Sequence, residues 1–303
     1  MPHRRIMKAT ERSWNLPIDV IHAHFAYPSG AAAASLTRSW GIPYVLTLHG
    51  SDVNFFPSQD RLAKRQFVRA VRAAARVTAV SEALAVRTVA ETGIKPIVLP
   101  IGLDLRKFSK PVEKTEARRI LGLPENRTLL LFVGNLYDKK GVRELLAALA
   151  ALSARNVLGV FVGAGPLSSL IEVSPWATLA GVQRNEAIPL FCNAADAMVL
   201  PSHAEGMPTV LVEAGAAGLP VIASNVGGIP ELLGEDRGVL IQPKSAADIV
   251  QAAIELMDEP MASLEQAARL RSYVHHHYDA DRNAALMVDI YREVIGGCYS
   301  ISS

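Results

Sequence analysis

The stretch from Val199 to Glu231 places the strongest constraint on the fold of this chain. It predicts a buried strand at Ala197–Leu200, a polar loop, a helix starting near Met207-Pro208, a second buried strand at Pro220–Ala223 and a Gly-Gly loop. Pro208 suits the first turn of a helix, because its missing N–H would have no partner there, and Gly218 suits the helix end. The two loops then share one edge of a parallel sheet, where open α/β folds bind ligands.

Two carboxylates belong to this stretch. Glu205 lies in the first loop and Glu213 in the first two turns of the helix, so both can face the same edge. Acceptor-only groups beside helix N–H donors predict a pocket for hydroxyls and phosphate together, and a nucleotide sugar offers both. Standing alone, such a pair would usually be a capping residue and a solvated helix face.

Further motif residues accompany the pair in order: Pro201-Ser202, Gly206, Pro208, Ala214, Gly218, Pro220-Val221, Gly227-Gly228 and Glu231. This series resembles the signature of the family-4 (group 1) retaining glycosyltransferases. The resemblance extends from about His22 to Tyr291 and implies the α/β GT-B fold, with two Rossmann-like doubly wound lobes. It implies an acceptor-side lobe over residues 1–106, a donor-binding lobe over 107–278 and a helix over 279–303 that crosses back to the first lobe.

Strands and helices alternate on both sides of a candidate linker at residues 104–126, which predicts two parallel sheets. Besides the two strands above, strands are predicted at Asp19–His24, Tyr44–Leu48, Val77–Val80, Ile97–Leu99, Leu129–Val133, Leu158–Val162, Thr178–Gly181 and Val239–Ile241. Helices are predicted at Ser29–Trp40, Asp60–Ala75, Ser81–Glu91, Gly141–Leu152, Asn185–Ala194, Ala246–Met257, Ala262–His275 and Ala280–Val294.

The first lobe is expected to be incomplete. In the family it opens with a strand, a glycine-rich loop and further βα units, whereas here the matching strand already begins at Asp19. The chain is therefore interpreted as a fragment, as a product of a misassigned start, or as half of a split enzyme whose partner chain supplies the missing elements.

Composition excludes some classes of function. With 303 residues, 50% of them hydrophobic, the chain can fill two cores. A net charge of +2 does not indicate a nucleic-acid partner. Basic residues nevertheless gather in the first lobe, which could contact anionic lipid head groups. They are Arg4, Arg5, Lys8, Arg12, Arg61, Lys64, Arg65, Arg69, Arg72 and Arg76.

Cysteine usage and hydropathy predict the compartment. Cys192 and Cys298 are the only cysteines and form no metal-ligand pattern, which indicates a reducing cytosol. The sequence has no apolar run of about 20 residues. We expect a cytoplasmic protein, at most peripheral on the inner face of the cytoplasmic membrane.

The segment FVGNLYDKKG, residues 132–141, predicts a strand, a tight loop and a helix start. Gly134 permits close backbone approach, and Lys140 can place a cation on a diphosphate without a metal. The family usually has an arginine in this loop where Asn135 stands here. The phosphate clamp is then weaker, or Lys139 compensates. The alternative for Lys140 is a solvated lysine at a helix start.

By resemblance, Glu213 accepts hydrogen bonds from the ribose hydroxyls and Glu205 holds hydroxyls of the donor sugar. Backbone amides of Gly206 and Met207, next to Pro208, would assist at the helix N-terminus. Gly227 and Gly228 would form an anion nest for the phosphates. For Glu231, capping of this loop and direct ligand contact both stay open.

Histidines mark the first lobe. His49 ends a strand, and the matching family residue lies beside the transferred sugar, so we interpret His49 as positioning the sugar rather than as a base. A structural histidine is the alternative. His22 and His24 share one strand face, but no third ligand stands at a suitable spacing, so no metal site and no cofactor are predicted.

The sequence thus predicts a metal-independent retaining glycosyltransferase in which Lys140, Glu205 and His49 serve the reaction. The donor would be a nucleoside-diphosphate sugar, with UDP preferred over GDP on family frequency, and the acceptor a glycan or lipid-linked intermediate. The alternative is a non-catalytic nucleotide-sugar-binding fragment or half of a split transferase. An NAD-dependent enzyme is disfavoured, because the sequence lacks a complete G-x-G-x-x-G after a strand.

Overall fold

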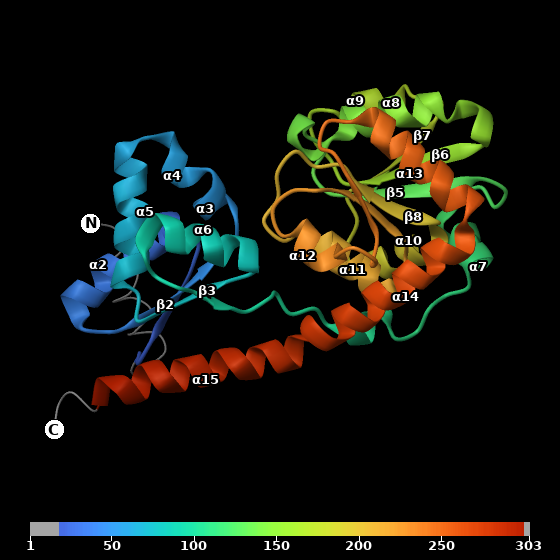
Figure 1. Ribbon diagram of the computed structural model, residues 1–303. Helices are drawn as coiled ribbons and strands as arrows, with labels where there is room; N and C mark the ends of the chain where they lie inside the picture. Colours follow the sequence, from blue (N-terminus) through green and yellow to red (C-terminus); the bar gives the residue numbers. More distant parts are fainter. Residues whose placement is uncertain (1–17, 300–303) are drawn as a thin grey trace. The chain divides into compact units, whose positions relative to one another are not determined.

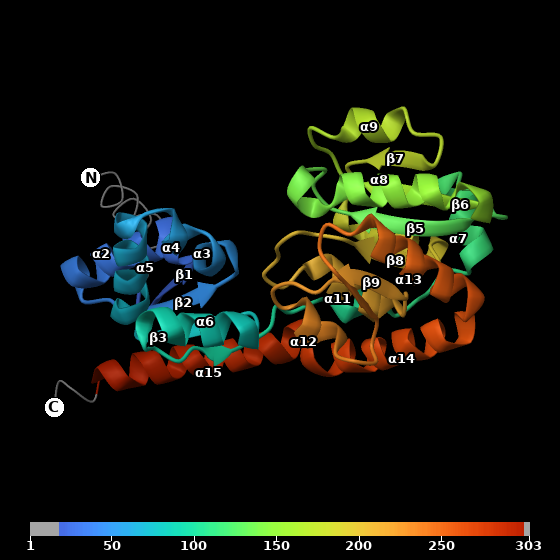
Figure 2. The same ribbon diagram turned by 45° about the horizontal axis from the view of Figure 1, so that its top comes forward.

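The computed structural model describes residues 18–299. The chain divides into two compact units, one formed by Met1–Ile101 with Asp281–Ser303 and the other by Gly102–Ala280. Each unit is built on its own parallel sheet (Figures 1 and 2). Arg4, Arg5, Lys8 and Arg12 of the predicted basic stretch lie outside the described residues.

Within the described residues 18–101, the first unit has four parallel strands in the order β1-β2-β3-β4. The strands are β1 (Ile21–His24), β2 (Tyr44–Leu48), β3 (Arg76–Ala79) and β4 (Ile97–Val98). They alternate with a turn η1 (Ala26–Gly30) and helices α2 (Ala31–Trp40), α3 (Ser51–Asn54), α4 (Phe56–Gln59), α5 (Arg61–Ala73) and α6 (Glu82–Thr92). Ser81 caps α6 as predicted, its hydroxyl accepting the N–H of Leu84 at 3.4 Å.

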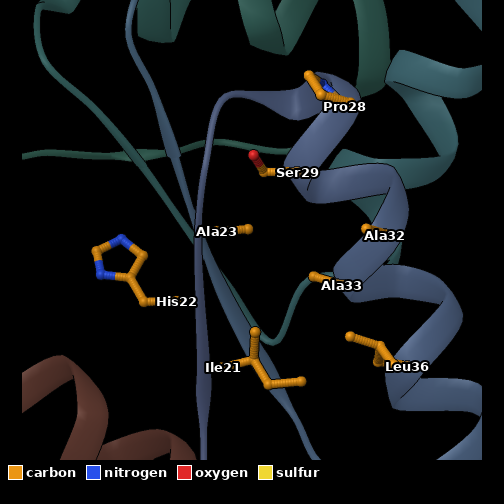
Figure 3. A pocket seen from close by; sticks show the side chains of 8 residues that line it. All are labelled: Ile21, His22, Ala23, Pro28, Ser29, Ala32, Ala33 and Leu36. Carbon is orange, nitrogen blue, oxygen red and sulfur yellow. The ribbon is translucent and has the colours of Figure 1, made fainter. Parts of the chain in front are cut away.

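The C-terminal helix α15 (Ala280–Tyr299) completes the first unit. Its Ile290 and Val294 are buried against Val45 of β2 and against Leu99. α2 lies on one side of β1, and α15 lies on the other, because His22 points away from α2 and bonds Tyr291 of α15 (Figure 3). The sheet of the first unit is therefore covered on both faces.

The second unit contains six parallel strands in the order β10-β9-β8-β5-β6-β7. The strands are β5 (Thr128–Val133), β6 (Val157–Val162), β7 (Ala177–Gly181), β8 (Ala197–Leu200), β9 (Val221–Ser224) and β10 (Val239–Ile241). Longer helices are α7 (Lys114–Leu121), α8 (Val142–Ala151), α10 (Ile188–Ala194), α11 (Thr209–Ala217), α13 (Ala246–Asp258) and α14 (Pro260–His277). Short helical segments are η2 (Leu105–Phe108), η3 (Asp138–Lys140), η4 (Ser153–Arg155), α9 (Ser168–Glu172), η5 (Asn185–Ala187) and α12 (Ile229–Leu233).

The order of these strands creates a switch point. From β5 the chain adds β6 and β7 on one side, and it then returns to add β8, β9 and β10 on the other side. All strands stay parallel, but the direction in which successive strands are added reverses between β5 and β8. Loops that leave the carboxyl ends of β5 and β8 diverge there and open a crevice at the sheet edge. The stretch identified first in the sequence lies at this crevice.

The predicted α/β class with two Rossmann-like parallel sheets is confirmed. The predicted helix near Met207-Pro208 and the Gly-Gly loop are both present, whereas the prediction of a linker was wrong. The helix after Glu205 begins at Thr209 with Pro208 as its N-cap. The Gly-Gly loop leads directly into α12 at Ile229. Residues 104–126 are not a free linker, since α7 buries Ala117 and Arg118 within the second unit.

Arg118 explains the difference in the linker. Its side chain is 5% exposed and donates to Asp196 at 2.7 Å and to the carbonyl of Ala194 at 2.8 Å. Asp196 also accepts the N–H of Leu129 at 2.7 Å. In a linker the charge of Arg118 would be exposed to solvent. Here it is buried in an ion pair that joins α7 to the start of β5 and to the turn before β8.

Among the helices of residues 18–299, none has the length and apolar character needed to cross a bilayer.

Candidate functional site

A cavity of about 460 Å³ lies at the carboxyl ends of β5, β6 and β7. The residues around it come from the loops after these strands, from α10 and from the first turns of α11. They are Val133, Gly134, Asn135, Val162, Gly163, Ala164, Val182, Gln183, Asn185, Ile188, Thr209, Val210 and Glu213. Three of the predicted donor-binding residues, Gly134, Asn135 and Glu213, therefore line one cavity.

The walls of the cavity depend on close backbone contact between two loops. Gly163 adopts a φ of +138°, and a Cβ there would lie 2.0 Å from the carbonyl oxygen of Gly134. No side chain fits such a gap, so only glycine allows these loops to touch. The contact keeps side chains out of this edge and leaves room for a ligand.

Glu213 is the carboxylate of this cavity. It lies on α11, and burial raises its pKa to about 7, while the nearby Lys107 acts in the opposite direction. A carboxylate that has lost much of its water is a strong acceptor for two adjacent hydroxyl donors. Its position and state suit the vicinal hydroxyls of a ribose.

Lys140 and Glu205 meet across the switch point. The ammonium of Lys140, at the end of the loop after β5, lies 2.5 Å from a carboxylate oxygen of Glu205, in the loop after β8. Their side chains are only 23% and 10% exposed. The two residues predicted to hold the diphosphate and the donor sugar are thus held next to each other.

The Gly-Gly loop packs directly behind Glu205. Gly227 has a φ of +58°, and a Cβ there would lie 2.1 Å from the carbonyl oxygen of Glu205. The N–H of Gly228 donates to the carbonyl of Gly206 at 2.7 Å. Two predicted donor-binding loops are therefore one backbone assembly.

Two side chains fix the loop after β8. The ring of His203 bonds the carboxylate of Glu144 in α8 at 2.8 Å, and the backbone N–H of His203 donates to the carbonyl of Lys139 at 2.9 Å. The side chain of Met207 is buried, and its sulfur accepts the hydroxyl of Tyr278 at 3.6 Å. Only the backbone of Met207 could then serve a ligand. These contacts hold the loop against the β5 loop and against Tyr278, which follows α14.

His49 lies in the first unit, at the carboxyl end of β2. Its ring bonds His24 at 2.8 Å, and burial is the main cause that lowers its pKa below the usual value. His22, beside His24, bonds Tyr291 at 2.6 Å and Thr47 at 2.7 Å, and burial lowers its pKa to about 4. His22 and His49 therefore favour the neutral imidazole, and both rings act as hydrogen-bonding groups.

A second cavity, of about 330 Å³, lies between β1 and α2 (Figure 3). Small side chains, among them Ala23, Ser29 and Ala33, surround it. The imidazole of His22 lies on the other side of β1 from α2. This cavity therefore brings none of the predicted site residues together.

Part of the cavity at the carboxyl ends of β5, β6 and β7 was not predicted from the sequence. Val182, Gln183 and Asn185 follow β7 and line it, and Thr209 and Val210 open α11 beside Glu213. The signal for the first group was available, since these residues follow a predicted strand at the same sheet edge. The pairing of Lys140 with Glu205 had no local signal, because distant loops supply the two partners.

Two parallel sheets, a cavity at a switch point and a lysine–glutamate pair beside it are typical of ligand-binding α/β proteins. The model of "Glycosyl transferases group 1" matches residues 113–277, and that of "Glycosyltransferase Family 4" matches residues 2–107. The chain belongs to the group 1 glycosyltransferase family, which confirms the resemblance of the motifs, and it is a glycosyltransferase.

One relative is the putative teichuronic acid biosynthesis glycosyltransferase TuaC of Bacillus subtilis (strain 168), 42% identical over 97% of this chain and 76% of its own. Among solved structures, sucrose-phosphate synthase from Thermosynechococcus elongatus is similar with a TM-score of 0.85 and 23% identity, over 97% of this chain and 77% of that one. HepE of Anabaena, solved in complex with UDP, is similar with a TM-score of 0.83 and 20% identity, over 96% of this chain and 82% of that one. These neighbours confirm the predicted GT-B fold.

Proposed function

We propose that this chain transfers a sugar from a nucleoside-diphosphate sugar, with UDP as the nucleotide, to a glycan or lipid-linked acceptor of the cell envelope. The observation that carries the proposal is the placement of Glu213 in a cavity of the β5–β7 edge, with the Lys140–Glu205 pair at the adjoining switch point. The UDP complex of HepE supports the choice of nucleotide, and the teichuronic acid biosynthesis for which TuaC is named supports the choice of acceptor.

In this mechanism the ribose hydroxyls donate to Glu213, and Lys140 lies against the diphosphate. The cation balances the charge that develops on the departing phosphate, so that the reaction proceeds without a metal. Hydroxyls of the transferred sugar donate to Glu205, which stays close to the diphosphate because Lys140 is its partner. The leaving phosphate takes the proton of the acceptor hydroxyl, the anomeric configuration is retained, and His49 positions the sugar.

The proposal places the protein in the cytoplasm, with the first unit in contact with an anionic membrane surface. Exposed basic side chains of α5, from Arg61, Lys64, Arg65, Arg69 and Arg72, support this contact. Such residues attract acidic lipid head groups over a distance of about 10 Å.

The decisive experiment is calorimetric titration of the chain with UDP and GDP in the presence of EDTA. We expect UDP to bind more tightly than GDP. Glu213→Ala should weaken binding by about 1–3 kcal/mol, because the hydrogen-bonding partner of the ribose hydroxyls is lost. Lys140→Ala should weaken it by a similar amount, whereas Lys139→Ala, an exposed neighbour, serves as the control.

Unchanged UDP affinity in Glu213→Ala and Lys140→Ala would refute the site. An equal loss in Lys139→Ala would show that Lys139 replaces the missing arginine of the family loop. An activity assay then distinguishes an enzyme from a non-catalytic binding module. Only an enzyme would release UDP from UDP-glucose when an acceptor glycan is added.

A further inference from the structure

Aromatic rings gather at the carboxyl ends of β1 and β2 in the first unit. The ring of Phe25 lies 4.6 Å from that of His49 between centroids. Tyr27 stacks on Phe56 at 4.5 Å with an angle of only 7° between the planes. Phe25 and Tyr27 are 40% and 45% exposed. Apolar rings that face solvent at the ligand-binding edge of a parallel sheet are a candidate binding surface.

Phe25 holds its position against a conformational cost. Its φ is +69° with a ψ of 135°, a region that bulky residues avoid. Backbone bonds on both sides fix it, because its N–H donates to the carbonyl of Thr47 at 3.0 Å and its carbonyl accepts the N–H of Gly30 at 2.9 Å. Strain that the surroundings maintain in this way is found mainly at functional sites.

A buried carboxylate ties the two loops together. Asp52 is 3% exposed and accepts the N–H of Ala26 at 2.9 Å, next to Phe25. It also accepts the N–H groups of His49 at 3.1 Å and Gly50 at 2.9 Å. The rings of Phe25 and His49 are therefore presented by a rigid frame, and Asp52 is a positioning residue of that frame.

The chemistry of the cluster combines flat apolar rings with hydrogen-bonding imidazole nitrogens. His24 and His49 bond each other at 2.8 Å, and His24 stacks on His22 at 4.3 Å. A pyranose ring has a face of C–H groups and a rim of hydroxyls, so it matches both halves of this surface. A hydrocarbon chain would contact only the aromatic rings and would offer no hydrogen-bonding group to the imidazoles.

We propose that Phe25 and the Tyr27–Phe56 stack form a subsite for the pyranose ring of the acceptor saccharide, with His24 serving its hydroxyls. The inference rests on the proposed transfer of sugar, because that function supplies a saccharide acceptor. It adds a chemical class to the acceptor, namely a ring bound by its apolar face, in place of recognition through a lipid chain.

The test is saturation-transfer NMR on the full chain with methyl glycosides of glucose, galactose, N-acetylglucosamine and glucuronic acid, and with octyl phosphate as the lipid-like probe. We expect the ring protons of at least one glycoside to receive saturation. Phe25→Gly should raise its dissociation constant about 3–10-fold, the usual contribution of one aromatic partner, and Tyr27→Ala should do the same. Phe55→Ala, an exposed aromatic of the same segment outside the stack, is the matched control.

Phe25→Gly is chosen because glycine accepts the backbone angles of Phe25 without strain. Thermal unfolding of the variant checks that the first unit remains folded, so that a loss of binding reports on the ring. The subsite is overturned if no glycoside binds the folded chain, if both variants bind as tightly as the original, or if octyl phosphate binds in their place.

Titration with UDP on the same samples separates the two proposals. Binding of UDP without any glycoside overturns the subsite and leaves the donor site. Glycoside binding that Phe25→Gly weakens, in a chain that does not bind UDP, supports the subsite and contradicts the donor site.

Discussion

Glu205 and Glu213 are the two carboxylates of one motif, yet the fold gives them different surroundings. Glu205 lies 2.5 Å from the ammonium of Lys140. Glu213 lines a cavity whose other walls are largely backbone and apolar side chains, and burial raises its pKa to about 7. The first carboxylate is placed beside a fixed cation, and the second is ready to bind hydroxyl groups.

The raised pKa of Glu213 predicts a pH dependence of stability. In the unfolded chain this carboxyl has its ordinary pKa, close to 4.3. Between about pH 4.5 and pH 7 the folded chain thus binds more protons than the unfolded chain, so this group loses stabilising effect as the pH rises. Glu213→Gln removes the effect. Its stability relative to the original chain should increase by at most about 3 kcal/mol from pH 5 to pH 8.

Urea unfolding of both chains at pH 5 and pH 8 measures this change. A stability difference that stays constant across the range would contradict a raised pKa at Glu213. The test uses no ligand, so its result is independent of which nucleotide the cavity accepts.

At the scale of the elements, α7 matters because it carries Arg118. This guanidinium bonds Asp196 and the carbonyls of Ala194, Glu125 and Arg127, while Lys114 of the same helix also bonds Asp196 at 2.8 Å. The network joins α7 to the sheet of the second unit below the switch point. The helix therefore supports the strands whose loops form the cavity.

Arg118→Ala should lower the free energy of unfolding of the second unit by about 3–5 kcal/mol, because it leaves a partly buried Asp196 with a weaker partner. The adjacent Arg119 is the control, since its side chain is 69% exposed and pairs with Glu116 on the same helix. Arg119→Ala should change stability by less than about 1 kcal/mol. Equal denaturant midpoints for Arg118→Ala and the original chain would rule out the structural role of α7.

The elements also show what the sequence can and cannot predict. Strand β5 was predictable, because its uninterrupted apolar run is typical of a strand buried on both faces. The helix α12 was not, since Gly228 and Pro230 favour a turn as strongly as a helix start. The burial of Arg118 and the pair of Lys140 with Glu205 depend on partners far along the chain, which no local pattern reveals.

At the scale of the whole molecule, the second unit is continuous in sequence and the first is not. The chain enters and leaves the second unit at neighbouring points, because Leu103 donates to Tyr278 at 2.6 Å and Ala280 donates to Leu103 at 3.1 Å. Each unit can therefore be produced as a separate polypeptide and tested for folding and binding.

A chain of residues 102–280 should fold cooperatively and bind UDP as tightly as the full chain. Residues 1–101 alone should not fold cooperatively, because they lack Ile290 and Val294 of α15, which cover the sheet. Thermal unfolding followed by circular dichroism checks both statements. Residues 1–101 joined to 281–303 by a short Gly/Ser linker should recover a cooperative transition, and failure to do so would contradict the assigned role of α15.

The return of α15 to the first unit also sets an order for events on the ribosome. β1 to β4 leave the exit tunnel first, but the helix that covers them is made only after the whole second unit. At about 5–20 residues per second, the first sheet waits about 10–40 s with an apolar face uncovered. During that interval the uncovered apolar face is open to aggregation, so slowing of translation near the end of the chain should increase aggregation rather than reduce it.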